Sequence, residues 1–330
     1  MDVDGIFEGI LRKERARLAR AISLVEDEAP GAAELLSLAY RHRKGAMVTG
    51  ITGAPGVGKS TMVDSLVSQL LARGKSVGVI AVDPSSPFTG GAILGDRVRM
   101  RSQHSTHSQV FFRSLASRGH LGGVSRHTGD VIALLDAYGF DHILVETVGA
   151  GQSEVDIMKY AHTVVVALAP GLGDDIQAIK AGIMEIGDVF CVNKADLPGA
   201  DRTQREIEMM LAMKDSFNGN EGDGQPPSWQ PPVIKAIAAS AEQTGISDLA
   251  DAVLSHHEYL RESQLLRSKN LRGYRAVLEE YLRLLTVQAI TDAAEAEGSM
   301  DKALDDLLEG RLGPLEAAQR LVSRFAPRPQ

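Results

Sequence analysis

The chain has 330 residues, of which 44% are hydrophobic, 24% charged and 5% aromatic, and its formal net charge at pH 7 is -8. This length allows one large domain with extensions, or two domains, with a sizeable buried core. The single cysteine excludes a disulfide scaffold and cysteine-rich metal clusters, and the negative charge gives no bulk electrostatic reason to expect nucleic acid as a partner.

The first 44 residues are predicted to form an N-terminal helical extension. Apolar side chains recur on one face between Ile6 and Leu24, and the basic residues between Arg12 and Arg20 form a solvated opposite face. The acidic residues near the N-terminus fit neither a signal peptide nor an acid-poor transit peptide. Since no uncharged apolar run approaches the roughly 18 residues of a transmembrane helix, we expect a cytoplasmic protein without a membrane partner.

Residues 45–260 are predicted to form the central domain. Short apolar runs alternate here with amphipathic helical segments such as Thr61–Arg73, Asp130–Tyr138 and Asp175–Ile186. The runs lack polar alternation, as expected for strands that are covered on both faces. We therefore predict an α/β fold with a mostly parallel central sheet and helices on both faces. The predicted strands are Ala46–Ile51, Val77–Val82, Val110–Phe112, His142–Val145, Thr163–Ala167, Val189–Val192 and Val233–Ile237.

Residues 261–330 carry no strand signal and are predicted to form a C-terminal helical arm. Apolar side chains recur at helical spacing from Leu271 to Leu285, and a second helical block spans Lys302–Leu308. Gly313 and a proline after it separate this block from a third around Leu315–Phe325. Because the arm is too thin to enclose a core of its own, its apolar faces are expected to pack on the sheet domain or on a second copy of the chain.

A glycine-rich segment directly follows the first predicted strand and opens a helical segment. It matches the P-loop pattern of glycine, four residues and Gly-Lys-Ser in the strand-to-helix context that supports it. Glycines let backbone N–H groups converge on phosphate oxygens at a helix N-terminus, where the helix dipole also favours anions. Lys59 is expected to reach the β- and γ-phosphates, and the Ser60 hydroxyl to ligate Mg²⁺. The candidate nucleotide-binding residues are Gly53, Ala54, Pro55, Gly56, Val57, Gly58, Lys59, Ser60 and Thr61.

An Asn-Lys-Ala-Asp motif ends at Asp196, directly after the predicted strand Val189–Val192. Open α/β sheets bind ligands at the carboxyl ends of their strands. A carboxylate at Asp196 can accept hydrogen bonds from the N1–H and the exocyclic amine of guanine, whereas adenine would leave a buried carboxylate unpaired. We therefore expect GTP and GDP as the ligands. The residues assigned to the base are Asn193, Lys194 and Asp196, with Ser240 and Ala241 in a small turn after the last predicted strand.

Acidic residues end two further predicted strands and are candidate magnesium ligands. Asp83 follows Val77–Val82, and Glu146 follows His142–Val145. Carboxylates at these positions can hold Mg²⁺ directly or through water, although each on its own also fits a helix cap or a turn. Gly149, three residues after Glu146, is placed to sense a γ-phosphate through its N–H group.

The residue that positions the attacking water is less well defined by the sequence. Gln152 lies three residues after Gly149, whereas the water-orienting glutamine of Ras-like switches follows the glycine more closely. We therefore expect slow intrinsic hydrolysis. Basic residues such as Lys180 and Arg97, Arg99 and Arg101 are either stabilisers of transition-state charge or surface charges. The candidate catalytic residues are Lys59, Glu146, Gln152 and Lys180.

Taken together, the motifs resemble those of the MeaB/MMAA-type G proteins, GTPase chaperones of methylmalonyl-CoA mutase in the SIMIBI class of P-loop GTPases. The resemblance covers nearly the whole chain. Besides the two motifs above, it rests on the strings Val82–Pro87, Gly90–Arg97, Glu146–Glu154 and Gly171–Lys180, the last similar to the family's switch III loop. Ala150 stands where the family commonly has a bulkier aliphatic residue.

The resemblance implies a role and a set of site residues. Ser60, Asp83, Asp96 and Glu146 would surround Mg²⁺, and Lys180 would lie in a loop that couples the nucleotide to the partner. The partner would be an adenosylcobalamin-dependent acyl-CoA mutase, whose cofactor loading the chain would gate and which it would protect or reactivate. The mutase would in turn stimulate GTP hydrolysis, and the chain would form a homodimer through its C-terminal helices.

Two other classes stay open as alternatives. A nickel or cobalt metallochaperone GTPase usually needs Cys and His ligand clusters, but Cys191 lies in an apolar strand and the nine histidines are scattered. His256 and His257, adjacent on a helix, do not easily face one metal ion. A P-loop kinase for a small metabolite rarely needs a guanine-reading motif.

Overall fold

A computed structural model of the chain describes residues 2–83, 107–116, 127–147, 157–171, 183–217 and 228–325. The chain divides into two compact units, Met1–Gly273 and Tyr274–Gln330. The first unit contains a parallel sheet with its covering helices, and the second contains helices alone.

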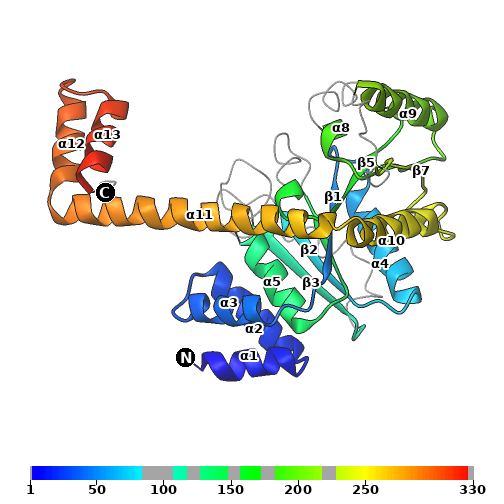
Figure 1. The fold of residues 1–330 in the computed structure, drawn as a ribbon, viewed down its shortest axis with the longest axis horizontal. Coiled ribbons are helices and arrows are strands. Elements are labelled where there is room, and N and C mark those ends of the chain that lie inside the picture. The colour runs from blue at the N-terminus through cyan, green and yellow to red at the C-terminus, as the bar shows by residue number, and fades with distance from the viewer. Residues whose placement is uncertain are drawn as a thin grey trace. The chain divides into compact units, whose positions relative to one another are not determined.

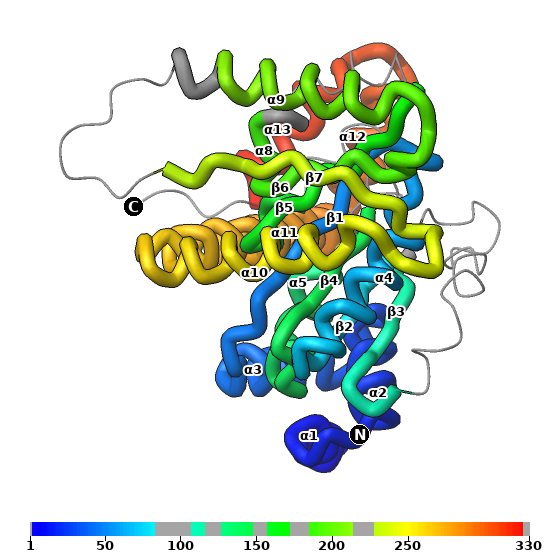
Figure 2. The backbone as a smooth tube through the Cα atoms, turned by 90° about the vertical axis from the view of Figure 1, so that its right-hand side faces the viewer, coloured from blue at the N-terminus to red at the C-terminus, as the bar shows by residue number. Residues whose placement is uncertain are grey.

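The first unit is built on a seven-stranded sheet in the order β3-β2-β4-β1-β5-β6-β7, with every neighbouring pair parallel (Figure 1 and, with each strand labelled, Figure 2). This confirms the predicted α/β fold. Two strand boundaries differ from the prediction by more than one residue: β3 runs on to Ala116, and β7 ends at Lys235 because the Ile237 N–H turns to the Thr244 carbonyl. The strands are β1 (Met47–Thr52), β2 (Val77–Asp83), β3 (Val110–Ala116), β4 (His142–Glu146), β5 (Thr163–Leu168), β6 (Val189–Val192) and β7 (Val233–Lys235).

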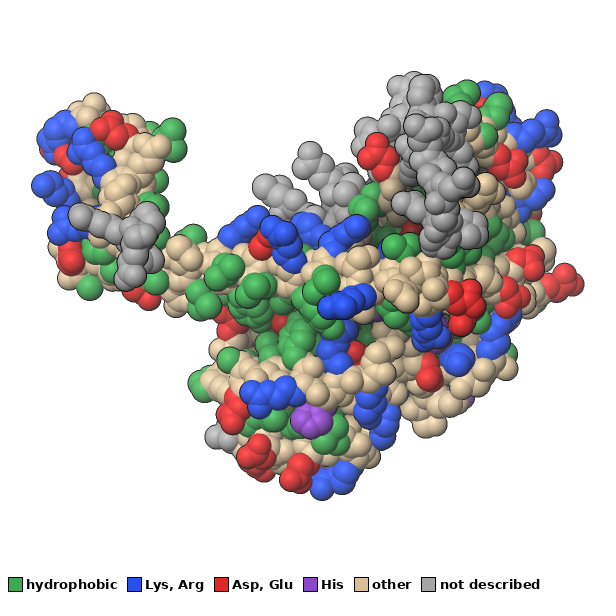
Figure 3. All heavy atoms as spheres, viewed as in Figure 1, with side chains coloured by type: hydrophobic (Ala, Val, Ile, Leu, Met, Phe, Trp, Pro, Cys, Tyr) green, Lys and Arg blue, Asp and Glu red, His purple; other side chains and the backbone are tan. Residues whose placement is uncertain are grey.

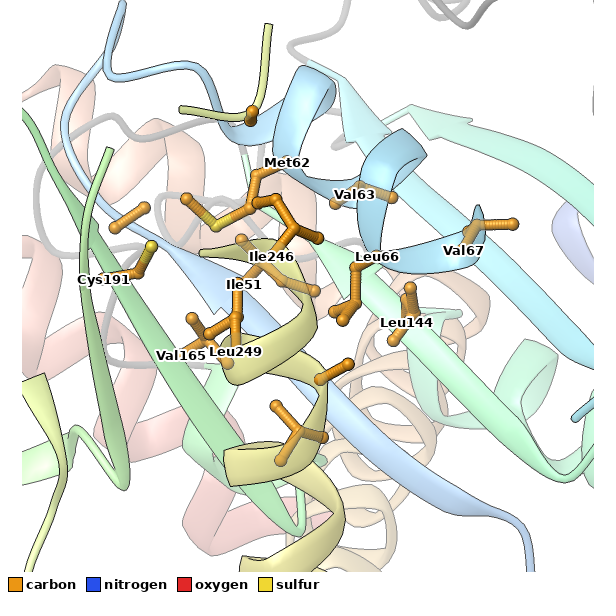
Figure 4. Packing of buried hydrophobic residues seen from close by; sticks show 14 of the residues in the cluster. Ile51, Met62, Val63, Leu66, Val67, Leu144, Val165, Cys191, Ile246 and Leu249 are labelled. Carbon is orange, nitrogen blue, oxygen red and sulfur yellow. The ribbon is translucent and has the colours of Figure 1, made fainter. Parts of the chain in front are cut away.

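One face of the sheet is covered by α4 (Lys59–Ala72) and α10 (Ile246–Glu262), which lie side by side (Figure 2). Leu66 of α4 and Leu249 of α10 are fully buried with Ile51 of β1 in one apolar cluster (Figure 4). Burying a side chain of this size contributes about 1.5–3 kcal/mol. The cluster therefore fixes both helices against the central strands, and with α4 it fixes the loop that precedes that helix.

The opposite face carries α5 (Thr128–Tyr138), a short 3-10 helix η1 (Ile157–Lys159) and the N-terminal helices. The three N-terminal helices pack on one another and on α5. Their bounds are α1 (Val3–Leu11), α2 (Arg15–Glu26) and α3 (Ala32–Arg41). The apolar face predicted for this segment is buried, at residues that include Ile6, Ile10, Leu18 and Ile22.

A buried carboxylate joins the end of this helical layer to the sheet. Asp136 of α5 is fully buried, and its Oδ1 accepts the backbone N–H groups of Lys44, Gly45 and Ala46 at 2.8–3.0 Å. Its Oδ2 accepts from Arg43 Nε at 2.7 Å. Four donors on one carboxylate hold the connection between α3 and β1 in a single conformation.

The remaining elements of the first unit lie toward the β7 edge of the sheet, where α9 contacts β6 and β7 (Figure 1). These are α8, described over Ile183–Ile186, and α9 (Ala200–Phe217). Trp229 packs against α10: its Nε1 donates to the Asp188 carbonyl at 2.7 Å, and its ring contacts those of His256 and Tyr259.

The C-terminal helices are α11 (Leu265–Ala296), which crosses the boundary between the units, α12 (Ser299–Leu308) and α13 (Pro314–Phe325). The buried side chains described from Tyr274 onward are Ala294 and Ala317. Large apolar side chains gather on the surface of α11 (Figure 3), and Leu278, Leu282 and Leu285 are 55–60% exposed. Within the parts of the chain that the structure describes, no helix has the length and apolar character that a bilayer crossing requires.

Candidate functional site

The glycine-rich loop 53–58 lies at the carboxyl end of β1 and leads directly into α4. Gly53, Gly56 and Gly58 all have positive φ angles, of 139°, 81° and 94°. At Gly53 a Cβ atom would stand 2.1 Å from the Ala167 carbonyl oxygen of β5. The loop can therefore turn this tightly against β5 only with glycine at position 53, and successive N–H groups in such a turn form an anion-binding concavity.

Lys59 places its ammonium group inside this loop. The residue is 7% exposed, and Nζ donates to the carbonyls of Gly53 at 2.7 Å and Ala54 at 3.0 Å. The loop thus curls around its own cation at the N-terminus of a 14-residue helix. A positive charge, a helix dipole and a glycine turn meet at one point, and this is the arrangement that binds phosphate groups.

Ser60 and Glu146 come together beside the loop. The Ser60 hydroxyl donates to Glu146 Oε1 at 2.6 Å, although the two residues stand 86 positions apart in the chain. Glu146 ends β4, and β2, which ends at Asp83, pairs with β4 as its parallel neighbour. The site thus holds a hydroxyl and a carboxylate oxygen, which are the hard oxygen ligands that Mg²⁺ prefers, so these residues fit that ion.

Asn193 connects two loops at the carboxyl edge of the sheet. Its buried side chain donates from Nδ2 to the Val57 carbonyl of the glycine loop at 2.8 Å. Its Oδ1 accepts the N–H of Ala238, in the loop after β7, at 3.1 Å. The next residue, Lys194, has φ of 55° and donates from Nζ to the Gly56 carbonyl at 2.7 Å. The Asn-Lys pair therefore holds the glycine loop in register with the loop that follows β7.

The residues assigned to a base surround this connection. The N–H of Ala195 donates to the Ala236 carbonyl, which brings position 196 toward the loop after β7. Asp196 itself is exposed in the structure, not buried as the sequence argument assumed, so burial of its carboxylate would have to come from the ligand. Ser240 is half-buried and donates to the Ile237 carbonyl at 3.0 Å, and Ala241 is exposed.

Several predicted site residues lie outside the described part of the chain. These are Asp96, Gly149, Gln152 and Lys180, and for Asp83 the structure describes the backbone but not the side chain. The described geometry therefore covers the glycine loop, Ser60, Glu146 and the Asn-Lys-Ala-Asp segment.

Two hydroxyl groups that the sequence analysis did not single out also hold this edge of the sheet. Thr147, directly after Glu146, donates from its N–H to the Ile51 carbonyl at 3.1 Å and from Oγ1 to Thr52 Oγ1 at 3.2 Å. Ser65 of α4 donates to the Ala238 carbonyl at 3.0 Å. A serine at a buried helix position is the one sequence signal that could have indicated the second contact.

The lone cysteine does not contribute to this site. Cys191 lies fully buried in β6, and burial raises the pKa of its thiol to about 12. The thiol is therefore protonated at neutral pH, whereas a metal-binding cysteine acts as the thiolate. Among the described residues, no group of three or more His, Cys, Asp or Glu side chains is arranged to hold a metal ion.

Comparisons with known proteins give a consistent result. The model of the family described as "Methylmalonyl Co-A mutase-associated GTPase MeaB" matches residues 18–297. A protein of Pyrococcus abyssi that is named as a GTPase is 42% identical over 326 residues, which are 98% of this chain and 97% of the relative.

A mouse protein named "Methylmalonic aciduria type A homolog, mitochondrial" is 31% identical over 343 residues, covering 99% of this chain and 80% of the relative. Among solved structures, a crystal structure of an LAO/AO transport system kinase matches with a TM-score of 0.67 at 24% identity. That match covers 99% of this chain and 98% of the other and concerns the fold alone.

Proposed function

The chain belongs to the MeaB family of methylmalonyl-CoA mutase-associated GTPases, and from this premise we propose that it is a GTP-hydrolysing chaperone of an adenosylcobalamin-dependent acyl-CoA mutase. The observation that carries the nucleotide part of the proposal is Asn193, which joins the glycine loop to the loop after β7. The glycine loop is suited to phosphate, and the Asn-Lys-Ala-Asp segment and the loop after β7 are assigned to the base. Because Asn193 joins these loops, together they suit a ligand with a phosphate at one end and a guanine at the other.

The phosphate end of the nucleotide is proposed to bind in the loop 53–58. The N–H groups of that loop and the Lys59 ammonium would hold the β- and γ-phosphates, with the lysine exchanging the carbonyls of Gly53 and Ala54 for phosphate oxygens. Ser60, Asp83, Asp96 and Glu146 are proposed to hold Mg²⁺, which when bound neutralises charge on the phosphates. The Ser60 hydroxyl would then turn from Glu146 toward the ion.

Hydrolysis by the chain alone is proposed to be slow. Lys59 and Glu146 lie in the described site, but Gln152 is displaced in sequence from the position that orients water in Ras-like switches. We propose that the mutase, acting through the segment that includes Lys180, completes the catalytic arrangement. The nucleotide state would in turn gate cofactor loading and reactivation of the mutase.

The chain is proposed to act as a homodimer with three functional parts. These are an N-terminal helical extension (1–44), a GTPase domain (45–260) and a C-terminal dimerisation arm (261–330). The exposed apolar side chains of α11 support this arrangement, because Tyr274, Leu278, Leu282 and Leu285 recur at helical spacing and are 42–60% exposed within one chain. A second copy of the same stripe would bury them.

Base recognition is tested by Asp196→Asn. An amide keeps one acceptor oxygen for the ring N1–H but replaces the other with an N–H donor. That donor faces the exocyclic amine of guanine, whereas it matches the carbonyl oxygen that xanthine carries at the same position, so GDP affinity should fall at least tenfold while XDP affinity rises. Equilibrium binding of the two nucleotides to wild type and variant gives the result. Unchanged GDP affinity in the variant would remove Asp196 from the base site.

The arm is tested by Leu278→Glu with Leu282→Glu, measured by sedimentation of the full chain. Two charges in the apolar stripe should convert the dimer to a monomer that still binds GDP. Glu280→Lys, which also changes charge on α11 but lies on the opposite side of the helix, is the matched control. A double variant that stays dimeric would contradict the role of the stripe.

A further inference from the structure

A second pocket lies at the amino ends of the strands, at the edge of the sheet opposite the glycine loop. It has a volume of about 450 Å³. The residues at its base are the first of β1 and β4, Met47 and His142, and its wall is the C-terminal half of α10. We call it the amino-edge pocket, and the charged and titratable residues that line it are Lys44, Lys75, Asp141, His142, His257, Glu258 and Arg261.

The amino-edge pocket carries more positive than negative charge. Lys44, Lys75 and Arg261 line it from three different segments, against two carboxylates. Asp141 is already engaged, because its Oδ2 accepts the N–H and hydroxyl of Ser76 at 2.8 and 2.6 Å. Burial alone would raise the pKa of Asp141, but these hydrogen bonds and nearby Lys75 outweigh burial and lower it. The carboxylate therefore stays charged, and its Oδ2 is already occupied by Ser76.

The cations of the pocket remain available to a ligand, because the second carboxylate, Glu258, pairs only weakly. Glu258 stands 3.7 Å from Arg261 on the exposed side of α10, a distance too long for a hydrogen bond. Among the described residues, neither Lys44 nor Lys75 has a carboxylate within ion-pair distance. Two of the three cations are therefore unpaired, and the third is weakly paired.

A fourth cation adds to this concentration of charge. The ammonium nitrogens of Lys13 and Lys44 lie 2.7 and 2.9 Å from the point where a Cβ of Gly139 would stand. Burial and the neighbouring charge of Lys44 lower the pKa of Lys13. Because these two like charges repel each other, an anion close to both would be stabilised more than at a typical surface site.

Two buried histidines provide a second and independent observation. His142 and His257 are 5% and 2% exposed, and their rings stack with centroids 5.3 Å apart. Among the residues that the structure describes, neither ring has a hydrogen-bond partner for its Nδ1 atom. His257 Nε2 lies 3.3 Å from Thr49 Oγ1, and when that hydroxyl donates, the proton of the neutral ring is on Nδ1. An unpaired buried N–H group is costly, and two unpaired ring nitrogens among the residues of one pocket indicate a polar ligand.

We propose that the amino-edge pocket binds a small molecule that carries a phosphate group. The donors stand on separate segments around the pocket, so the ligand must accept from several directions. The three terminal oxygens of a phosphate do this, whereas the two oxygens of a carboxylate lie in one plane. The excess of unpaired cations matches a dianion.

This site is separate from the proposed nucleotide site. His142 and Glu146 are the first and last residues of β4, so the two sites stand about 13 Å apart along one strand. No residue of the amino-edge pocket belongs to the glycine loop or to the Asn-Lys-Ala-Asp segment. Substitutions at Lys75 or Arg261 are therefore expected to leave GTP hydrolysis unchanged.

The test is calorimetric titration of the full chain, preloaded with GDP and Mg²⁺, with inorganic phosphate and in a second arm with succinate. Wild type should bind phosphate saturably and succinate at least about tenfold more weakly. Lys75→Gln with Arg261→Gln should weaken phosphate binding at least about tenfold, since a charge-assisted hydrogen bond corresponds to that factor or more. Lys302→Gln, which removes a cation of the C-terminal unit, is the matched control and should bind as wild type.

Ring resonances of His142 and His257 locate the bound anion. They should shift on addition of phosphate to wild type and not in the double variant. Phosphate that binds equally to wild type and double variant occupies another site, and that result would overturn the proposal. Absence of saturable binding to wild type would overturn it too, and equal binding of succinate would overturn the assignment to phosphate.

Discussion

Asn193 offers the sharpest perturbation of the proposed nucleotide site, because one side chain links its two halves. Nδ2 donates to the Val57 carbonyl and Oδ1 accepts the Ala238 N–H, and all three residues are buried. Replacing Asn193 with alanine removes both hydrogen bonds and leaves a buried donor and a buried acceptor without partners. Each unsatisfied group costs about 1–3 kcal/mol. We therefore expect Asn193→Ala to lower the free energy of unfolding by about 2–6 kcal/mol.

Asn193→Asp separates the two contacts. Its Oδ1 still accepts from Ala238, but a carboxylate oxygen faces the Val57 carbonyl where an N–H donated, so one bond is kept and the other becomes repulsive. We expect this variant also to destabilise the protein and to accelerate GDP release, because the glycine loop loses one of the two side-chain hydrogen bonds that tie it to the Asn-Lys-Ala-Asp segment and keeps that of Lys194. The assays are urea unfolding of the nucleotide-free chain and the dissociation rate of a fluorescent GDP.

Gln204→Ala is the matched control for these variants. It also removes an amide, but one whose hydrogen bond to Glu208 lies in an exposed i,i+4 pair of α9. Its effect on unfolding should stay within about 0.5 kcal/mol, and GDP release should not change. If Asn193→Ala matched Gln204→Ala in both assays, the reasoning from the buried connection would be refuted.

Three further predictions concern stability, each measured by urea unfolding. Gly53→Ala should lower the free energy of unfolding by about 3 kcal/mol or more, because the new Cβ would meet the Ala167 carbonyl oxygen at 2.1 Å. Gly74→Ala, at φ of 73° with open space around it, should lower it by only about 1 kcal/mol. Equal losses in the two variants would contradict this. Burial lowers the pKa of His162 from 6.5 to about 4, so between these pH values the unfolded chain binds more protons than the folded one and stability falls as the pH drops. His162→Gln should reduce the slope of that fall by about 1.4 kcal/mol per pH unit. An unchanged slope would count against this reasoning. Asp136→Ala should cost about 3–5 kcal/mol, because it leaves three N–H groups and a guanidinium without their carboxylate, and a cost below about 1 kcal/mol would be inconsistent with the structure.

The fold could be predicted from the sequence because its signals are local. All seven strands of the sheet overlap the predicted apolar runs, since a parallel strand that is covered on both faces has no polar alternation. The glycine loop is equally local, because its residues are consecutive and its strand-to-helix context can be recognised in the sequence. Strand ends were less predictable: β7 stops at Lys235 because a turn takes the hydrogen bond of Ile237.

The connections within the site could not be predicted, because their partners are distant in the chain. The motif assigns Asn193 to the base. In the structure its side chain donates a hydrogen bond to the carbonyl of Val57, 136 positions away. The motif predicts a buried carboxylate at Asp196, whereas the structure has this residue exposed. No sequence pattern marks either outcome, since both depend on how loops from different strands meet at the sheet edge.

The histidines show the same limitation. His142 begins a strand and His257 lies near the end of a helix, and in sequence they are two among nine scattered histidines. Their stacking follows from the packing of α10 across the amino ends of β1 and β4. Only the folded arrangement places their ring nitrogens near Lys44 and Lys75, for none of which the described residues supply a partner.

The rate of GTP hydrolysis tests whether this MeaB-family GTPase acts on a cobalamin-dependent mutase. The measurement compares the purified chain alone with the same chain in the presence of adenosylcobalamin-dependent methylmalonyl-CoA mutase from the same cells. We expect slow turnover by the chain alone and at least tenfold faster turnover with the mutase. Fast turnover without a partner, or a rate that the mutase leaves unchanged, would contradict the proposed coupling.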